Sequence, residues 1–407
     1  MVVNRLISGI LLFLCVSCAQ AQSDGAQETD CGSAQFAIED YAQDDAHGMA
    51  QFYDKLHRAS SAKSPVRIGY FADSWIESDV LTVDLREKLQ SRFGGYGIGW
   101  VDCTPGMYRN RPTIGLASEG IDGHVVIKKP FDKALEGISQ RYFLPKDKSS
   151  ITLTAKKYRE HAAKWQCASL FFRAPNGFMV TTVQNGADTT TSKMSVGSTH
   201  VQRFDFPAKE MTSLKCTFTD VKPGTVLFGT ALESPNGVVL DNLGVRSLQG
   251  YQLLDIPDTT LADFARLRPY DLIVLHFGVN AMSKVTNEKK LTYYINKMKR
   301  VIERFRNAYP QATILVLSLS DNKMGRAKDN EMLAQMQREM AKECKVPFFS
   351  VFEAMGGSGS IGRFVKNGWA SSDHVHINFK GGEQVATYIF NALEQGYQQR
   401  HGGDSKK

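Results

Sequence analysis

Four residues in three separate segments have side chains that together could hydrolyse an ester. Ser74 follows the apolar run 66–71, Asn280 follows a second apolar run, and Asp373 stands three residues before His376. A serine hydroxyl becomes a good nucleophile when a histidine takes its proton, and a nearby carboxylate can orient that histidine. An asparagine amide can donate a hydrogen bond to the oxyanion of an acyl-transfer reaction. These residue types predict ester hydrolysis through an acyl-serine, provided that the fold brings the segments together.

Two of these residues, and two of their neighbours, also have a simpler interpretation. A serine such as Ser74 can merely cap a helix, and an asparagine such as Asn280 can merely form a turn. His276 lies inside an apolar run, so we expect a buried histidine with a hydrogen-bond partner. Asp73 is expected to hold the turn before the serine rather than to take part in chemistry.

Strands and helices are predicted to alternate on both sides of a long central segment. Continuous apolar runs are typical of buried parallel strands, and apolar residues at helical spacing are typical of helices. The predicted strands are 66–71, 271–277, 312–317 and 346–351, and the predicted helices are 44–58, 81–93, 288–309, 330–343 and 383–393. This order predicts an α/β fold with a doubly wound parallel sheet. Such sheets bind ligands at the carboxyl ends of their strands, and a helix beginning after Ser74 would supply N–H groups there.

Between residues 104 and 234 the pattern changes to short β-branched and aromatic runs separated by turn residues. The predicted strands are 124–128, 151–155, 168–173, 178–183, 201–206, 213–219 and 225–232. Short strands at this spacing are typical of an antiparallel β-sandwich. We therefore expect an all-β insert that interrupts the α/β domain.

The candidate segments resemble the blocks of the SGNH (GDSL-type) hydrolase family. That family has a GDS serine, a glycine, a GxN asparagine and a DxxH pair. In this chain the same order is given by 72–74, Gly244 within Asp241-Asn242-Leu243-Gly244, 278–280 and 373–376. One departure is Ala72, which stands where the family has glycine and removes no functional atom. The resemblance covers about residues 66–103 and 235–395, and it implies a flavodoxin-like parallel sheet.

The resemblance also implies a role for each matching residue. Ser74 corresponds to the nucleophile, His376 to the base and Asp373 to the carboxylate that orients it. The oxyanion hole would consist of the backbone N–H groups of Ser74 and Gly244 with the side chain of Asn280. The DxxH spacing favours His376 over its neighbour His374, which is left with a structural or substrate-facing role. No metal or cofactor is implied.

The length of the chain between the first two blocks narrows the resemblance. A β-sandwich inserted there resembles bacterial peptidoglycan O-acetylesterases, whose insert is similar to a carbohydrate-binding module. The resemblance implies an exported serine esterase that removes O-acetyl groups from a glycan or cell-wall polymer, with peptidoglycan as the favoured substrate. The alternatives are a lipase, lysophospholipase or thioesterase of the same fold, and a non-catalytic glycan-binding surface protein. Four aromatic residues of the insert are candidates for stacking on sugars or for its core: Tyr108, Trp165, Phe171 and Phe172.

The first residues predict export. Arg5 precedes the apolar run 6–16, and Ala19-Gln20-Ala21 is typical of a signal-peptide cleavage site. We expect a periplasmic protein, or alternatively a lipoprotein anchored through Cys18. No later apolar run is long enough to cross a membrane. The predicted division has four parts. Residues 1–21 are a signal peptide, and residues 22–64 are a polar segment with one amphipathic helix. Residues 65–103 and 235–397 form a split hydrolase domain, and residues 104–234 are a β-sandwich insert with a candidate carbohydrate-binding role.

Composition and cysteine content exclude several other classes of protein. The 407 residues are 42% hydrophobic and 22% charged, which excludes wholesale disorder, and the net charge of +7 is scattered without a basic run that would indicate nucleic-acid binding. Five cysteines would remain after cleavage, and Cys167 with Cys216 is the plausible disulfide, unpaired thiols being equally open. Neither CxxC pairs nor HExxH occur with zinc-binding spacing in the mature part. The sequence does not indicate an oligomeric state.

Overall fold

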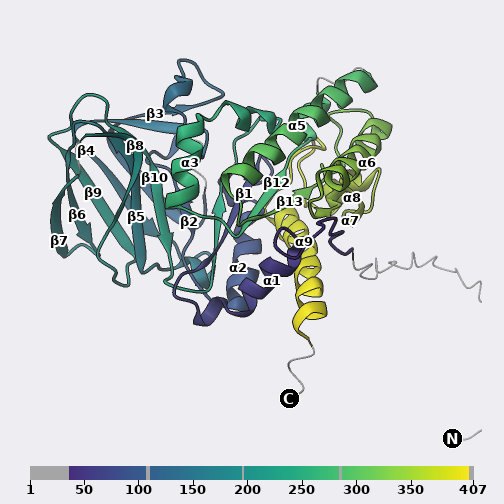
Figure 1. The fold of residues 1–407 in the computed structure, drawn as a ribbon, viewed down its shortest axis with the longest axis horizontal. Coiled ribbons are helices and arrows are strands. Elements are labelled where there is room, and N and C mark those ends of the chain that lie inside the picture. The colour runs from purple at the N-terminus through teal and green to yellow at the C-terminus, as the bar shows by residue number, and fades with distance from the viewer. Residues whose placement is uncertain (1–35, 107–110, 195–196, 284–286, 403–407) are drawn as a thin grey trace, which may run out of the picture. The chain divides into compact units, whose positions relative to one another are not determined.

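The computed structural model describes residues 36–106, 111–194, 197–283 and 287–402, and these residues form two sheets of different kinds (Figure 1). One sheet is parallel and is surrounded by helices, and the other is antiparallel. The predicted signal peptide 1–21 and the lipidation candidate Cys18 lie outside the described residues. Within the described residues, no helix is long and apolar enough to cross a membrane.

The parallel sheet draws its strands from the two ends of the described chain. Its strands are β1 (Val66–Ala72), β11 (Val238–Asn242), β12 (Leu272–His276), β13 (Thr313–Leu317) and β14 (Phe348–Phe349). Their spatial order is β11-β1-β12-β13-β14, and all adjacent pairs are parallel. Strand order reverses at β1, which lies between the second and third strands in sequence. Ligands of open parallel sheets bind at this kind of position.

Helices pack against both faces of the parallel sheet. The α-helices of the described residues are α1 (Met49–His57), α2 (Thr82–Phe93), α3 (Asp258–Leu267), α4 (Val279–Met282), α5 (Glu288–Ala308), α6 (Ala327–Cys344), α7 (Val351–Ala354), α8 (Ser360–Lys366) and α9 (Phe379–His401). Successive residues of β12 point to opposite faces, so Ile273 belongs to the core with α5 while Val274 belongs to a separate core with α2 and α9. The predicted α/β fold with a parallel sheet is confirmed.

The antiparallel sheet is built from residues 99–233, which we call the antiparallel region. Its strands are β2 (Gly99–Val101), β3 (Ile114–Val125), β4 (Arg141–Ala155), β5 (Cys167–Ala174), β6 (Met179–Gln184), β7 (Asp188–Lys193), β8 (Ser198–Asp205), β9 (Ser213–Thr219) and β10 (Val226–Glu233). The main path is β7-β6-β9-β4-β10-β5-β8, with β2 on β10 and β3 on β4. Strand β4 pairs with β10 near its start and with β9 near its end.

This pairing gives one curled sheet, and the predicted sandwich of two separate sheets is not confirmed. The inner face is filled by a core to which strands from both halves of the path contribute, including Leu170 of β5 and Phe218 of β9. Strand β2 precedes the expected boundary at residue 104, because its residues pair with Thr230, Ala231 and Leu232 of β10.

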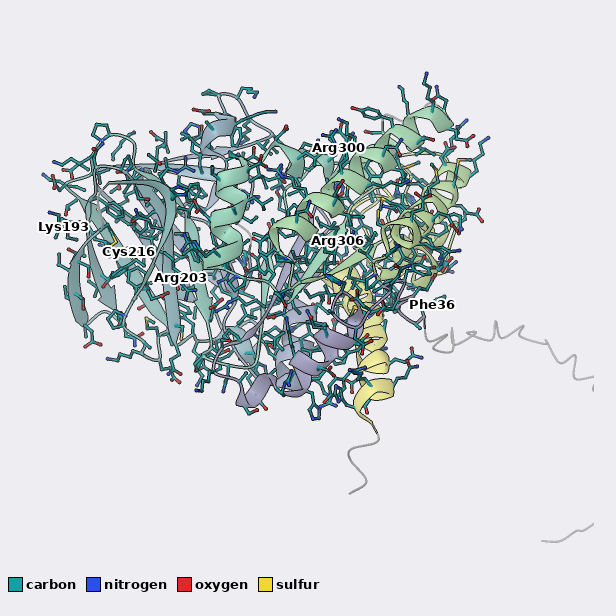
Figure 2. The ribbon with its side chains drawn as sticks, in the orientation of Figure 1. Phe36, Lys193, Arg203, Cys216, Arg300 and Arg306 are labelled. Atoms are coloured by element: carbon teal, nitrogen blue, oxygen red, sulfur yellow. The ribbon has the colours of Figure 1, made fainter. Side chains whose placement is uncertain are left out.

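The candidate disulfide is absent from the described residues, and the alternative of unpaired thiols holds. Cys167 and Cys216 are both free, as are Cys103 and Cys344. Cys216 is fully buried in β9 within the antiparallel sheet (Figure 2), and burial raises the pKa of its thiol. Cys167 lies on β5, which is separated from β9 by β10 and β4 in the sheet order. The sequence pattern placed both cysteines in strands, but it did not predict that two other strands lie between them.

Buried ion pairs join the antiparallel region to the parallel sheet. Arg268 follows α3 and contacts Asp241 of β11 at 2.5 Å and Glu233 of β10 at 2.6 Å. Arg67 of β1 pairs with the same Glu233 at 3.0 Å. Asp241 also accepts a hydrogen bond from the N–H of Trp100 in β2 at 2.8 Å. Because a buried charge that loses its partner is costly, these pairs fix the joint between the two sheets.

Candidate functional site

Ser74 lies in a tight turn directly after β1. The N–H of Trp75 donates to Oδ1 of Asp73 at 3.1 Å, which closes the turn as expected for Asp73. Ser74 itself is half-buried. The helix predicted at 81–93 begins at Thr82, and a short 3₁₀ turn at Glu77–Asp79 lies between Ser74 and its start. The expectation that the helix start supplies N–H groups at Ser74 is therefore wrong.

Asp373 and His376 form the expected pair in the loop before α9. Oδ2 of Asp373 lies 2.7 Å from Nδ1 of His376, and Oδ1 accepts hydrogen bonds from the N–H groups of Val375 and His376 at 2.9 and 3.0 Å. Burial would raise the pKa of Asp373, but the hydrogen bonds from His376 and the backbone outweigh it and hold the pKa below its usual value. With Nδ1 bound to the carboxylate, Nε2 of His376 is the nitrogen left for a substrate. Both side chains are 47% exposed.

The serine turn and the histidine loop are in direct contact. Trp75 is buried, and its Nε1 donates to the carbonyl oxygen of Val375 at 3.1 Å. Ser74 and His376, the candidate nucleophile and base, are the immediate chain neighbours of these two residues. Ser74 forms no hydrogen bond to His376 in the described structure. Such contacts are often long in unliganded enzymes and shorten when substrate binds.

Asn280 belongs to the same site and contacts the serine turn. It follows Gly278, whose φ of 139° lies in a region that favours glycine, at the start of α4. Nδ2 of Asn280 donates to Oδ2 of Asp73 at 2.8 Å and to the carbonyl oxygen of Leu248 at 3.1 Å. These bonds fix the amide with its nitrogen beside the residue that precedes Ser74. To act on an oxyanion, one N–H group would have to be shared with it or exchanged for it.

Gly244 packs closely against the other side of the serine turn. A Cβ atom at Gly244 would lie 2.6 Å from Cγ1 of Ile76 and 3.2 Å from the carbonyl oxygen of Asp73, so only glycine fits without a shift. Its N–H donates to Oδ1 of Asn242 at 3.0 Å, and its carbonyl oxygen accepts from Nη2 of Arg141 at 2.8 Å. The structure thus brings all four sequence blocks together at the carboxyl edge of β1.

The carboxyl group of Asp73 is buried between these blocks. Asp73 is only 2% exposed, and this burial raises its pKa to about 6, although the N–H of Trp75, the amide of Asn280 and the charge of His376 favour the ionised form. The raised pKa means that burial outweighs the hydrogen bonds that the carboxylate receives.

A buried network of charged and polar side chains around Asp79 lies next to the serine turn. Asp79 pairs with Arg111 at 2.7 Å and Arg86 at 3.1 Å, and Oδ1 of Asp79 accepts from Nδ2 of Asn242 at 3.2 Å. Burial alone would raise the pKa of Asp79, but the two guanidinium groups outweigh it and hold the pKa far below its usual range. Asn242 in turn receives the N–H of Gly244, so the network connects the antiparallel region to the glycine block.

Several residues singled out in the sequence lie outside this chemistry. His276 is buried and contacts the hydroxyl of Tyr70 at 2.9 Å, and burial lowers its pKa to about 3, as expected for a core histidine. His374 has a φ of 56°, and its Nδ1 is buried without a hydrogen-bond partner. Trp165, Phe171 and Phe172 are all buried, so they form core rather than a surface for sugars. The fourth aromatic candidate, Tyr108, lies outside the described residues.

Sequence reasoning did not identify three of the residues that hold the site together. Trp75, Asn242 and Arg141 act through contacts with segments distant in sequence. The position of Trp75 directly after the candidate serine, and of Asn242 two residues before Gly244, was a signal that could have been used. Arg141 has no such signal. Among residues 36–402 as described, no group of three or more metal-ligating side chains is found.

Comparison with known proteins agrees with the geometry. Residues 217–382 match the model of the GDSL-like Lipase/Acylhydrolase family, a range that includes Gly244, Asn280, Asp373 and His376 and begins after Ser74. No curated protein matches the chain.

Among solved structures, a peptidoglycan O-acetylesterase matches with a TM-score of 0.73 and 23% identity, over 89% of this chain and 99% of that chain. A family 3 carbohydrate esterase from Talaromyces cellulolyticus matches with a TM-score of 0.30 and 17% identity, over 40% of this chain and 73% of that one. A family two carbohydrate esterase from Clostridium thermocellum, in complex with cellohexaose, also has a TM-score of 0.30, with 12% identity over 70% and 100% of the two chains. Only the first likeness is strong enough to show the fold.

The fold, the convergence of the four blocks and the family match lead to the same assignment. Residues 217–382 match the GDSL-like Lipase/Acylhydrolase family, and this match together with the fold supports a carboxylic ester hydrolase.

Proposed function

We propose that the protein is an exported serine esterase that removes O-acetyl groups from a glycan, with O-acetylated peptidoglycan as its favoured substrate. The observation that supports this most is the likeness to a peptidoglycan O-acetylesterase over 89% of the chain, a share that must include much of the antiparallel region. Lipases of the same family fold would explain the site but would not account for the match of the antiparallel region.

In the proposed first step, Oγ of Ser74 attacks the carbonyl carbon of the acetyl ester. Nε2 of His376 takes the hydroxyl proton, and Asp373 stabilises the imidazolium through the 2.7 Å contact at Nδ1. The bond between the acetyl carbon and the sugar oxygen then breaks, and His376 returns the proton to that oxygen. The products of this step are the free sugar hydroxyl and acetyl-Ser74.

In the second step, water attacks acetyl-Ser74 and gives up a proton to His376. Acetate leaves, and the serine hydroxyl is restored when His376 returns the proton. The oxyanion of both steps would be held by the N–H groups of Ser74 and Gly244 and by Nδ2 of Asn280. Gly244 and Asn280 both lie against the serine turn, which supports these roles, although their N–H groups donate within the protein and would have to be shared with the oxyanion or exchanged for it.

We further infer that the parallel sheet and its helices form the doubly wound arrangement of this family and that residues 104–234 are an insert within it. We also infer that the first 21 residues direct export to the periplasm, with anchoring through Cys18 as the alternative. A polymer of the cell wall would be accessible to an enzyme in that location.

Acetate release tests the proposed substrate. The mature chain and Ser74→Ala are incubated with O-acetylated peptidoglycan, acetylated xylan and a short-chain lipid ester, and acetate or acid is quantified over time. The proposal predicts the highest rate on O-acetylated peptidoglycan and no release by Ser74→Ala. Preference for the lipid ester would indicate a lipase, and binding to peptidoglycan without release of acetate would indicate a glycan-binding protein. Either result would contradict the proposal.

A further inference from the structure

An exposed tyrosine of the antiparallel region lies beside the histidine loop. Tyr158 belongs to the turn between β4 and β5, and it remains 38% exposed although most aromatic side chains of this region are buried. Its ring centroid lies 6.1 Å from that of Phe379, at an interplanar angle of 56°. Phe379 is the first residue of α9 and follows His376 by three positions, so its Cα lies within about 11 Å of that histidine.

A second contact ties the same turn to the serine side of the site. Arg159 donates from Nε to Oδ1 of Asp84 at 2.8 Å, and its Nη2 lies 2.6 Å from the same oxygen. Asp84 is buried in the first turn of α2, which follows the Ser74 segment. The first turn of α9 packs closely against that segment as well, because a Cβ atom at Gly382 would lie 1.9 Å from the carbonyl oxygen of Val80. Tyr158 is therefore held at the point where the starts of α2 and α9 meet.

The position of Tyr158 is also fixed by a charge on its ring. The guanidinium carbon of Arg159 lies 4.9 Å from the centroid of the Tyr158 ring, within the range of a cation–π contact. The ion pair with Asp84 restrains Arg159, so the aromatic ring is presented with little freedom to move. A restrained ring loses less conformational entropy when a ligand packs on it.

We propose that Tyr158 and Phe379 form a binding subsite for a pyranose ring of the glycan whose acetyl group enters the Ser74 site. This inference rests on the proposed function and names the part of the chain that would recognise the polymer. An aromatic ring offers an apolar surface for the C–H face of a sugar, while the phenol hydroxyl and the guanidinium of Arg159 remain polar partners for sugar hydroxyls. The short path from His376 to Phe379 suits a sugar adjacent to the one that is deacetylated.

The subsite predicts that loss of the Tyr158 ring affects a polymer but not a small ester. In Tyr158→Ala, kcat/KM for acetate release from O-acetylated peptidoglycan should fall about tenfold, mostly through KM, which is the size expected for one aromatic packing contact. The rate on p-nitrophenyl acetate should stay within about twofold of wild type because that ester does not reach the subsite. Tyr158→Trp, which keeps an aromatic surface, should restore most of the polymer activity.

Tyr293 provides a matched control. It is another exposed tyrosine with a cation near its ring, since Nζ of Lys297 lies 5.4 Å from the ring centroid, but it is on α5. Tyr293→Ala should leave the rates on O-acetylated peptidoglycan and on p-nitrophenyl acetate unchanged. Equal polymer activity in Tyr158→Ala and wild type, or an equal loss on p-nitrophenyl acetate, would overturn the subsite.

A binding measurement separates failure of the subsite from failure of the proposed function. Ser74→Ala and the double variant Ser74→Ala/Tyr158→Ala are sedimented with insoluble O-acetylated peptidoglycan, and the bound fraction is measured. The subsite predicts about tenfold weaker binding of the double variant, and equal binding would overturn it. If wild type releases no acetate from any glycan while Tyr158 still governs binding, the proposed esterase function fails and the subsite stands.

Discussion

The two sheets of this protein use their side chains in opposite ways. At the carboxyl edge of the parallel sheet, polar residues of three loops remain partly exposed, and Asp373 and His376 are each about half accessible. In the antiparallel region, by contrast, Trp165, Phe171 and Phe172 are buried in cores. We propose that the loops of the parallel sheet supply the reacting groups. The proposed contributions of the antiparallel region lie at its border with the parallel sheet. Arg141 contacts Gly244 there, and Tyr158 lies beside the histidine loop.

Removing the base should have the largest effect on the parallel-sheet side of this comparison. His376→Ala should lower kcat for p-nitrophenyl acetate by at least about 10³-fold, because Ser74 loses its proton acceptor. His374→Asn is the matched control, since asparagine tolerates the positive φ found at that position, and it should keep most of the activity. A larger loss in His374→Asn than in His376→Ala would reverse the assignment of the base.

The amide of Asn280 should come next in size. Asn280→Ala should lower kcat by about 10²–10³-fold with little change in KM, as expected when one oxyanion donor is lost. Steady-state kinetics on p-nitrophenyl acetate measures kcat and KM separately and so checks this prediction. If KM rose while kcat stayed constant, Asn280 would be a substrate-binding residue and its bonds to Asp73 and Leu248 would be purely structural.

A smaller effect is expected from the antiparallel side. Arg141 is buried, donates to the carbonyl oxygen of Gly244 at 2.8 Å and pairs with Asp102 at 3.2 Å. Arg141→Lys keeps the charge but cannot make both contacts with one ammonium group, so kcat should fall about tenfold with a folded protein.

Arg203 is the matched control on the same sheet (Figure 2). It also reaches across to the parallel-sheet side, donating to the carbonyl oxygen of Leu267 at 3.0 Å, but it does not contact the site segments. Arg203→Lys should keep kcat within about twofold of wild type. Equal losses in the two variants would mean that the joint matters only for overall stability and not for Gly244.

The last prediction concerns the titration of Asp73, which should affect activity least. Its effect should be seen in how the free energy of unfolding depends on pH. Its pKa in the folded protein, about 6, lies above the usual 3.8, so its protonated form stabilises the fold at low pH and this contribution is lost as pH rises through 6. The free energy of unfolding of wild type, relative to Asp73→Asn, should therefore fall by about 2 kcal/mol between pH 4 and pH 7.

Asp373→Asn provides a control of opposite sign for that measurement. The pKa of Asp373 is lowered, so its contribution to stability is present above about pH 4 and is lost as pH falls. Denaturant unfolding at several pH values would measure both variants. The same direction of change for Asp73 and Asp373 would contradict the different environments assigned to the two carboxyl groups.

The sequence predicted those parts of the fold whose signal is local. Strand β12 and helix α5 were predicted closely, because a continuous apolar run and a long apolar stripe at helical spacing each have one simple interpretation. The convergence of Ser74, Gly244, Asn280 and the Asp373–His376 pair followed from family order together with the rule for carboxyl ends of parallel strands. Their catalytic roles remain predictions.

What the sequence did not predict depends on distant contacts. Strand β7 is an exposed edge strand of mostly threonine and serine, without the apolar alternation that marks a strand, and it forms because β6 pairs with it. Helix α3 was missed because only a few of its residues, such as Leu261 and Phe264, are buried. The contact of Arg141 with Gly244 joins residues far apart in the chain and leaves no local pattern.

The central claim is that Ser74 is the nucleophile in a site assembled from these loops. The most direct test is to treat the protein with a fluorophosphonate, which forms a covalent adduct with activated serines, and to map the adduct by peptide mass spectrometry. The account predicts one adduct, on Ser74, together with loss of p-nitrophenyl acetate hydrolysis, and neither adduct nor hydrolysis in Ser74→Ala. An adduct on another serine, or hydrolysis that persists in Ser74→Ala, would contradict it.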